Sequence, residues 1–133
     1  MSKSDTIRAV YAAFQRGDIP AIVDQCAANV DWDNSRVQSN ECPWNGNFSG
    51  TSRVPGFFAA VGENLDFKVF DPHTFVESGD NVVVLLRLES TVKKNGRPLI
   101  NDSVHAWKVN ADAKITSYRH FNDTAMELAA WRA

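Results

Sequence analysis

The chain has 133 residues, of which 44% are hydrophobic, and a formal net charge of -2. This length fits one ordinary domain over residues 1–133, and the hydrophobic fraction excludes a disordered chain. With 14 basic and 16 acidic side chains and no clustered basic face, no nucleic acid partner is expected. No apolar stretch approaches the roughly 20 residues of a membrane span, and no apolar signal region follows Met1. We therefore expect a cytoplasmic protein without a membrane partner.

The first third of the chain predicts helices. Apolar residues recur at helical spacing from Ile7 to Phe14, which indicates one buried helical stripe. Ser4 is expected to cap this helix and Gly17 to end it. Asp18 is expected to cap a second helix, which buries Cys26 on its apolar side.

A short strand over residues 30–33 precedes a polar loop over residues 34–49 that contains Trp44 and Phe48. Loops of this kind often act as lids over a site. The alternative is that both rings anchor the loop to the core. A third helix is expected to open at Gly50-Thr51 and to carry Phe57 and Phe58.

Strands dominate the remainder of the chain. They are expected over residues 65–70, 74–78, 82–93, 99–109 and 114–121. Asp71-Pro72 signals a bend or bulge, and Asn95-Gly96 a hairpin turn. Residues 122–124 cap a final helix. Helices before and after a run of antiparallel hairpins predict the α+β class, with helices on one face of the sheet.

The strand that begins at Val82 is apolar on both faces over its first residues. One face can build the core, and the other needs a second cover. A homodimer packed through the sheet would supply it.

His105 lies in the middle of a predicted strand, in register with Asn101, Ser103 and Trp107. A face that mixes polar groups with a large ring suits a pocket wall, where a histidine can move protons near neutral pH. The alternative is a structural histidine that is hydrogen-bonded within the sheet.

The strand phase stays open at two places. Either His120, with Tyr118, or Arg119 points inward on the last strand. On the first strand either Asp31 and Asp33 or the apolar residues between them point inward. An inward carboxylate would have a raised pKa and could act as a base.

No metal site and no cofactor are expected. His73, His105 and His120 lie far apart without paired ligand spacing, and Cys26 and Cys42 form no CxxC pair. No phosphate-binding glycine loop or nucleophile elbow is present.

Several segments together resemble the SnoaL-like proteins, which are ketosteroid-isomerase-related members of the nuclear-transport-factor-like superfamily. They are residues 11–18, 30–32, 79–85, 105–109 and 114–124, in this order. The resemblance implies a cone-shaped, curved antiparallel sheet wrapped around the N-terminal helices, with a short C-terminal helix. It also implies a pocket at the open end and, in most members, a dimer.

The resemblance further implies site positions. The general base of the steroid isomerases falls at Asp33, and their oxyanion-hole acid falls at His105. The catalytic aspartate of the cyclases and epoxide hydrolases falls at His120, which favours the phase with His120 inward. The tyrosine donor of the steroid isomerases falls at Val10, and Tyr11 stands next to it.

These observations lead to one main hypothesis, a cofactor-independent acid–base enzyme of isomerase, cyclase or hydrolase type. Asp33 or His120 would take a proton, while His105 and Tyr118 donate hydrogen bonds to the developing oxyanion. The substrate would be a largely apolar carbonyl or hydroxylated ring compound. The residues expected to bind it are Tyr11, Trp32, Trp44, Phe57, Phe58, Trp107 and Tyr118. The alternative is a non-catalytic module of the same fold that binds a small ligand or only associates as a dimer.

Overall fold

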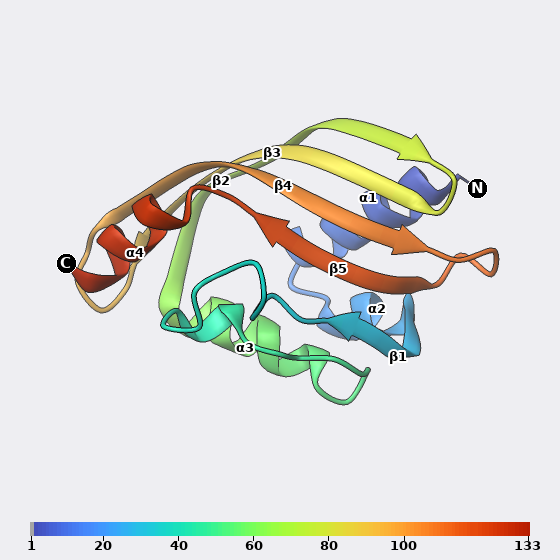
Figure 1. The fold of residues 1–133 in the computed structure, drawn as a ribbon, viewed down its shortest axis with the longest axis horizontal. Helices are drawn as coiled ribbons and strands as arrows, with labels where there is room; N and C mark the ends of the chain where they lie inside the picture. The colour runs from blue at the N-terminus through green and yellow to red at the C-terminus, as the bar shows by residue number, and fades with distance from the viewer. Residues whose placement is uncertain (1) are drawn as a thin grey trace.

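The computed structural model describes residues 2–133. Its elements are α1 (Lys3–Gln15), α2 (Ile19–Asp24), β1 (Cys26–Trp32), the 3-10 turn η1 (Pro43–Asn45), α3 (Val54–Asn64), β2 (Leu65–Ser78), β3 (Asn81–Val92), β4 (Pro98–Val109), β5 (Ile115–Phe121) and α4 (Thr124–Arg132). The long strands arch over α1, α2 and α3, and α4 lies at one end of the molecule (Figure 1). None of the helices in this part of the chain is both long and apolar enough to cross a membrane.

The five strands form one sheet in the order β1-β5-β4-β3-β2. The pairs β2–β3, β3–β4 and β4–β5 are antiparallel hairpins, whereas β1 runs parallel to β5. A parallel pair needs a long connection, and most of the chain lies between these two strands. The α+β class is therefore confirmed, with a mixed sheet that is curved and not closed.

Strand β1 begins earlier than its sequence predicts. The amide of Ile115 donates to the carbonyl of Gln25 at 2.8 Å, and Cys26 then pairs with Ile115. The second helix stops at Asp24 because the backbone beyond it enters the sheet. The prediction that Cys26 lies on a helix face was wrong, although its side chain is buried.

The helix ends follow their sequence signals with two exceptions. The third helix, expected to open at Gly50-Thr51, begins at Val54. Gly17 has a φ of 73° after α1, and the Asp18 side chain caps α2 through the amide of Ala21. The cap of α1 is Ser2, not Ser4. Ser2 Oγ accepts from the Asp5 amide at 3.1 Å, and the Asp5 carboxylate accepts from the Ser2 amide at 3.1 Å. This reciprocal pair satisfies two end donors at once, which a cap at Ser4 would not.

The inner face of the sheet alternates residue by residue. On β4 the buried side chains are Leu99, Asn101, Ser103, His105, Trp107 and Val109. Their antiparallel partners on β3, Val82, Val84 and Leu86, point the same way. The pairing of β2 with β3 shifts register between Pro72 and Thr74, a bulge where the bend was predicted. The inner face therefore combines an apolar floor with a row of polar groups.

The loop over residues 34–49 is tied to the core. The Trp44 ring is buried and lies edge-on to Trp131 of α4, with ring centroids 5.5 Å apart. The Asn34 side chain accepts from the amide of His120, and Gln38 donates to the His120 carbonyl. The two aromatic rings of this loop, Trp44 and Phe48, pack on the core cluster, so they anchor the loop.

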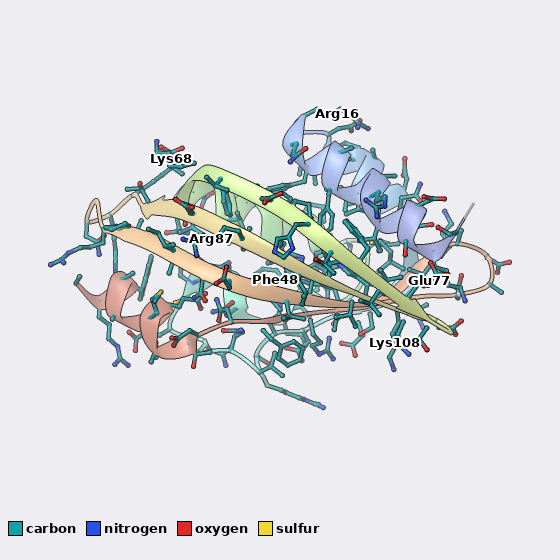
Figure 2. All side chains as sticks on the ribbon, turned by 90° about the horizontal axis from the view of Figure 1, so that it is seen from above. Arg16, Phe48, Lys68, Glu77, Arg87 and Lys108 are labelled. Atoms are coloured by element: carbon teal, nitrogen blue, oxygen red, sulfur yellow. The ribbon has the colours of Figure 1, made fainter. Side chains whose placement is uncertain are left out.

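The outer face of the sheet carries exposed apolar side chains over the first half of β3. Leu85 is 38% exposed, and Val76 and Phe121 are 54% and 42% exposed. Val83 pairs with Val76, and Val104 pairs with both Leu85 and Phe121, so these side chains share one face. Arg87 lies further along the same face (Figure 2). An exposed apolar area of this kind favours association.

We expect this face to form a homodimer interface of about 1,200 Å² or more. Sedimentation at micromolar concentration should then give twice the 14.8 kDa chain mass. Leu85→Lys should yield folded monomers, as circular dichroism can check, because the side chain is 38% exposed in the single chain. Ala111→Lys, in the exposed β4–β5 turn, adds the same charge elsewhere and should remain dimeric. A wild-type protein that sediments as a monomer would reject the interface.

Candidate functional site

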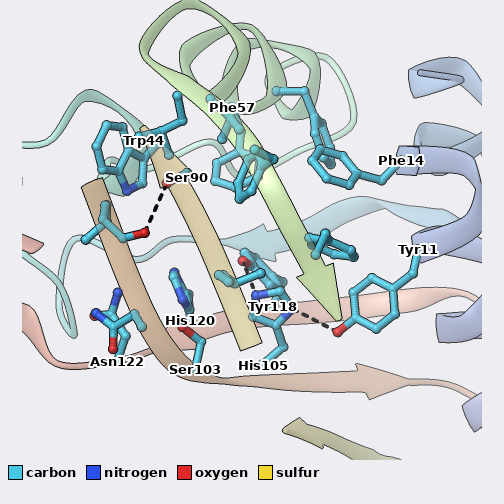
Figure 3. Close-up of a pocket in the computed structure, with 18 of the residues that line it drawn as sticks. Tyr11, Phe14, Trp44, Phe57, Ser90, Ser103, His105, Tyr118, His120 and Asn122 are labelled. Carbon is cyan, nitrogen blue, oxygen red and sulfur yellow. Dashed lines mark hydrogen bonds between the residues drawn. The ribbon is translucent and has the colours of Figure 1, made fainter. Parts of the chain in front are cut away.

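A cavity lies between the inner face of the sheet and the helices, with an empty volume of about 770 Å³, part of it open to solvent. A concave site with a mostly apolar wall is the usual form of a small-molecule site. The cavity is lined by the predicted residues Tyr11, Trp32, Trp44, Phe57, Phe58, His105, Trp107, Tyr118 and His120 (Figure 3). Most of the wall is aromatic or aliphatic, so the few polar atoms on it stand out.

His105 stands at the centre of a buried hydrogen-bond chain. The Trp107 indole N–H donates to the Tyr11 hydroxyl at 3.0 Å, and that hydroxyl lies 2.8 Å from His105 Nδ1. His105 Nε2 lies 3.4 Å from the Tyr118 hydroxyl. Helix α1, strand β4 and strand β5 therefore meet at one imidazole.

The donors in this chain favour one tautomer of His105. An indole N–H can only donate, so the Tyr11 oxygen accepts from Trp107 and its own proton is free for His105 Nδ1. His105 then carries its proton on Nε2, which faces the Tyr118 oxygen. The Tyr118 hydroxyl proton is left available to the cavity.

Burial sets the protonation of these groups. His105 is 6% exposed, and burial lowers its pKa well below the usual 6.5, with a further lowering by His120. Burial raises the pKa of the Tyr118 phenol well above its usual range. At neutral pH the imidazole is uncharged and the phenol keeps its proton, so both can act as hydrogen-bond donors.

His120 lies beside His105, with ring centroids 5.1 Å apart and the rings nearly perpendicular. Its Nε2 is buried and has no hydrogen-bond partner among residues 2–133. Burial lowers the pKa of His120, and the Glu127 carboxylate acts in the opposite direction. An uncharged imidazole with a free nitrogen at a cavity wall can accept a proton.

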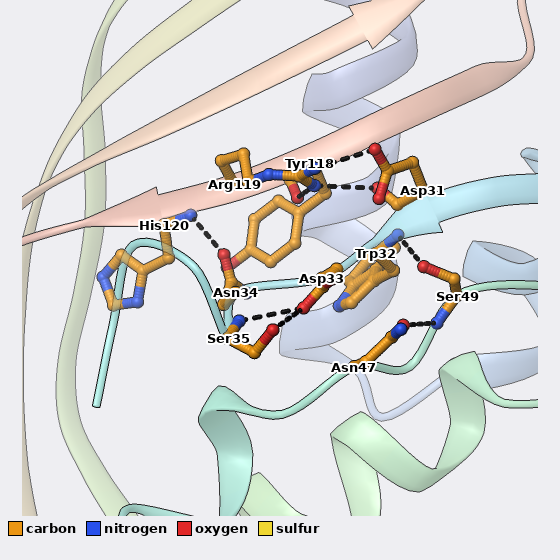
Figure 4. A network of polar contacts seen from close by, with 10 residues as sticks. All are labelled: Asp31, Trp32, Asp33, Asn34, Ser35, Asn47, Ser49, Tyr118, Arg119 and His120. Carbon is orange, nitrogen blue, oxygen red and sulfur yellow. Dashed lines mark hydrogen bonds and ion pairs between the residues drawn. The ribbon is translucent and has the colours of Figure 1, made fainter. Parts of the chain in front are cut away.

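Asp33 lies outside the cavity. Val30 and Trp32 point inward on β1, and the Asp33 carboxylate instead accepts from the Ser35 amide at 2.9 Å (Figure 4). Hydrogen bonds from the Ser35 side chain lower the pKa of Asp33. Arg119 likewise points out of the cavity and pairs with Asp31 at 2.7 Å. The strand phases that the sequence left open are therefore resolved: Trp32 and His120 face the cavity.

Glu127 is a charged cavity residue that the sequence did not reveal. It comes from α4, is 2% exposed and lines the cavity. Asn45 Nδ2 donates to Oε1 at 2.6 Å, and Asn122 Nδ2 donates to Oε2 at 2.8 Å. In the sequence it reads as an acidic residue in the first turn of a helix, where it also favours the helix dipole. Only the packing of α4 on β4 places it inside.

Across residues 2–133, no three His, Cys, Asp or Glu side chains come close enough together to hold a metal ion. Cys42 is fully buried near Glu127. Burial, followed by the charge of Glu127, raises the pKa of the Cys42 thiol to about 12. The thiol therefore stays protonated and is a poor nucleophile.

The comparisons with known proteins agree with this fold. The SnoaL-like domain model matches residues 7–118, and the chain belongs to this family. No match was found among the curated proteins.

Three solved structures illustrate the likeness. An NTF2-like protein of unknown function from Burkholderia pseudomallei is 27% identical, with a TM-score of 0.86 over 100% of both chains. TerC, co-crystallised with polyporic acid, is 26% identical, with a TM-score of 0.82 over 98% of both chains. A protein with a ketosteroid isomerase-like fold from Catenulispora acidiphila, in complex with trimethylamine, is 16% identical, with a TM-score of 0.75 over 94% of this chain and 90% of that one.

The lowered pKa values of His105 and His120 predict a pH dependence of stability. The unfolded chain binds protons at these histidines more readily than the folded protein does. Their contribution is therefore complete above the unfolded pKa of about 6.5 and is lost as the pH falls below it toward the folded pKa. Urea unfolding at about pH 7.5 and about pH 5.5 should give a smaller free energy of unfolding at the lower pH.

The His105→Gln variant should reduce that difference because it removes one of the two titrating groups. The matched control is His73→Gln, at an exposed position. A wild-type free energy of unfolding that is equal at the two pH values would contradict the buried, uncharged histidines.

Proposed function

We propose that the protein is a cofactor-independent acid–base enzyme of the isomerase or cyclase type. Its substrate is a largely apolar carbonyl or hydroxylated ring compound. The observation that carries the proposal is a set of buried polar atoms, on residues that line the cavity, that have no partner among residues 2–133. They are Trp32 Nε1, Ser103 Oγ, His120 Nε2 and Asn122 Oδ1. Buried polar atoms are normally paired, so an unpaired set around one cavity points to a polar ligand group.

Tyr118 and His105 form the donor side of the proposed site. When His105 Nε2–H donates to the Tyr118 oxygen, the Tyr118 hydroxyl can donate its own proton to a group in the cavity. A substrate carbonyl oxygen that accepts from Tyr118 would gain negative charge as a neighbouring C–H bond breaks. A donor held in place in a dry site stabilises that charge strongly.

His120 is the proposed base. Its free Nε2 takes the proton from carbon, and the electron pair of the C–H bond moves into the enolate. The resulting imidazolium can return the proton at another carbon, which completes an isomerisation. The nearby Glu127 carboxylate stabilises the imidazolium, and no outside oxidant or co-reactant is needed. Asp33 has no part in this scheme because it lies outside the cavity.

The aromatic wall supports an apolar ring as the body of the substrate. Trp32, Trp107 and Tyr118 form one cluster, with Trp32 and Trp107 each 4.5 Å from the Tyr118 ring centroid. Rings of this kind stack on flat ligands. TerC, which has the same fold and was co-crystallised with polyporic acid, supports a small organic ligand.

Proton exchange tests the proposal without knowledge of the true substrate. A panel of cyclic ketones in deuterium oxide should exchange protons next to the carbonyl faster with the protein than without it. His120→Ala should lower the protein-dependent rate by about 10²–10⁴-fold, the usual contribution of a general base. Tyr118→Phe should lower it as well, because the oxyanion loses its donor.

His73→Ala, which removes an exposed histidine, is the control and should exchange at the wild-type rate. Binding without accelerated exchange would contradict catalysis and leave the non-catalytic binding module. Equal rates for wild type and His120→Ala would reject His120 as the base.

A further inference from the structure

The end of the cavity next to α4 differs chemically from the Tyr11 end. Figure 3 shows Tyr11 and Asn122 at opposite sides, with His105, Tyr118 and His120 between them. At the α4 end Glu127 is buried, and each of its oxygens accepts from an amide N–H, one from Asn45 and one from Asn122. Both partners are donors, as a carboxylate requires.

Within the described residues 2–133, no cation neutralises Glu127. The ion pairs formed by residues 2–133 do not include it, and the residues that line the cavity contain no Lys or Arg. The imidazole of His120 is kept uncharged by burial. A buried charge without an opposite charge is costly, so a positive group that entered the cavity would be strongly favoured there.

Of the two amides, Asn122 lines the cavity and adds a further acceptor at this end, whereas Asn45 supports Glu127. Their nitrogens are fixed toward the carboxylate, which turns each amide oxygen the other way. Asn45 Oδ1 and Asn122 Oδ1 are both buried, and neither has a donor among residues 2–133. A group that fits several acceptors and one negative charge is an ammonium with several N–H donors.

The walls suit the same kind of group. Trp44, which precedes Asn45 in the chain, lines the cavity, and so do Phe57 and Trp32, whose ring centroids lie 5.4 Å apart. Faces of aromatic rings attract organic cations, most strongly where water is excluded. A carboxylate combined with aromatic rings is therefore selective for a cation with an apolar body.

We propose that Glu127, with Asn45 and Asn122, forms a subsite for a protonated amine carried by the ring compound that this cavity binds. The inference refines the substrate class of the proposed function and rests on the same cavity. The oxygen of the substrate lies at Tyr118, and its basic nitrogen lies at Glu127. The subsite acts in binding, and Glu127 affects proton transfer from carbon only through His120, whose imidazolium it stabilises.

Equilibrium binding of two probes tests the subsite. Benzylamine, protonated near neutral pH, and benzyl alcohol, uncharged, have the same ring and nearly the same size. Titration followed by the fluorescence of the cavity tryptophans should show benzylamine binding tighter by about tenfold or more, as expected for a charge-assisted contact. Raising the pH until the amine loses its proton should abolish the preference in the wild-type protein.

The Glu127→Gln variant removes the charge and keeps the size of the side chain. A glutamine can still bond both neighbouring amides if one of them turns over, so the fold should be retained, which circular dichroism checks. This variant should bind the two probes equally. The control is Glu63→Gln on the exposed side of α3, which loses the same charge and should keep the wild-type preference.

Equal binding of the two probes by the wild type, or a preference that persists in Glu127→Gln, would overturn the subsite. The pH series needs no variant, so the proposal can be rejected even if Glu127→Gln does not fold. The ketones of the exchange assay carry no amine. That assay can therefore fail while amine binding succeeds, and the reverse also holds.

Discussion

The hydrogen bond between the Tyr11 hydroxyl and His105 Nδ1 connects helix α1 to the middle of the sheet. The other polar groups at this end of the cavity depend on it. It fixes which nitrogen of His105 carries the proton, and that nitrogen in turn faces Tyr118. Loss of a partner from such a buried pair leaves an unsatisfied group that costs about 1–3 kcal/mol. The same contact therefore holds the fold and orients the donors.

The dry aromatic surroundings explain why so few polar atoms can define a site. Each ring that lines the cavity excludes water, which disfavours charge on His105 and His120 and lowers their pKa values. The same exclusion strengthens every hydrogen bond and charge that remains. The cavity thus holds proton donors near Tyr11 and acceptors near α4, with an uncharged base between them.

The sequence was informative where local pattern decides structure. The alternation along β4 placed His105 and Trp107 on the inner face, and Gly17 and Asp18 marked the break between the first two helices. The cavity walls on β4 and β5 followed from two-residue periodicity combined with the family resemblance.

Local sequence pattern did not predict the structure where contacts between distant segments decide it. The phase at Asp33 depends on how β1 pairs with β5, a contact between distant segments that leaves no periodic signal. Glu127 resembled an ordinary surface acid of a helix first turn, and its burial depends on the docking of α4. The amide partners of Glu127 are Asn45, 82 residues before it, and Asn122, five residues before it, so no single motif connects the three residues.

The protonation of His105 at atomic level is the most direct test of the account. Nitrogen NMR of imidazole-labelled protein at neutral pH separates a protonated ring nitrogen from a bare one. The hydrogen-bond chain requires His105 to be uncharged, with its proton on Nε2 and with Nδ1 bare. Tyr11→Phe should release this preference while Tyr118→Phe leaves it in place. A proton on Nδ1, or on both nitrogens, would contradict the donor order that aims the Tyr118 hydroxyl into the cavity.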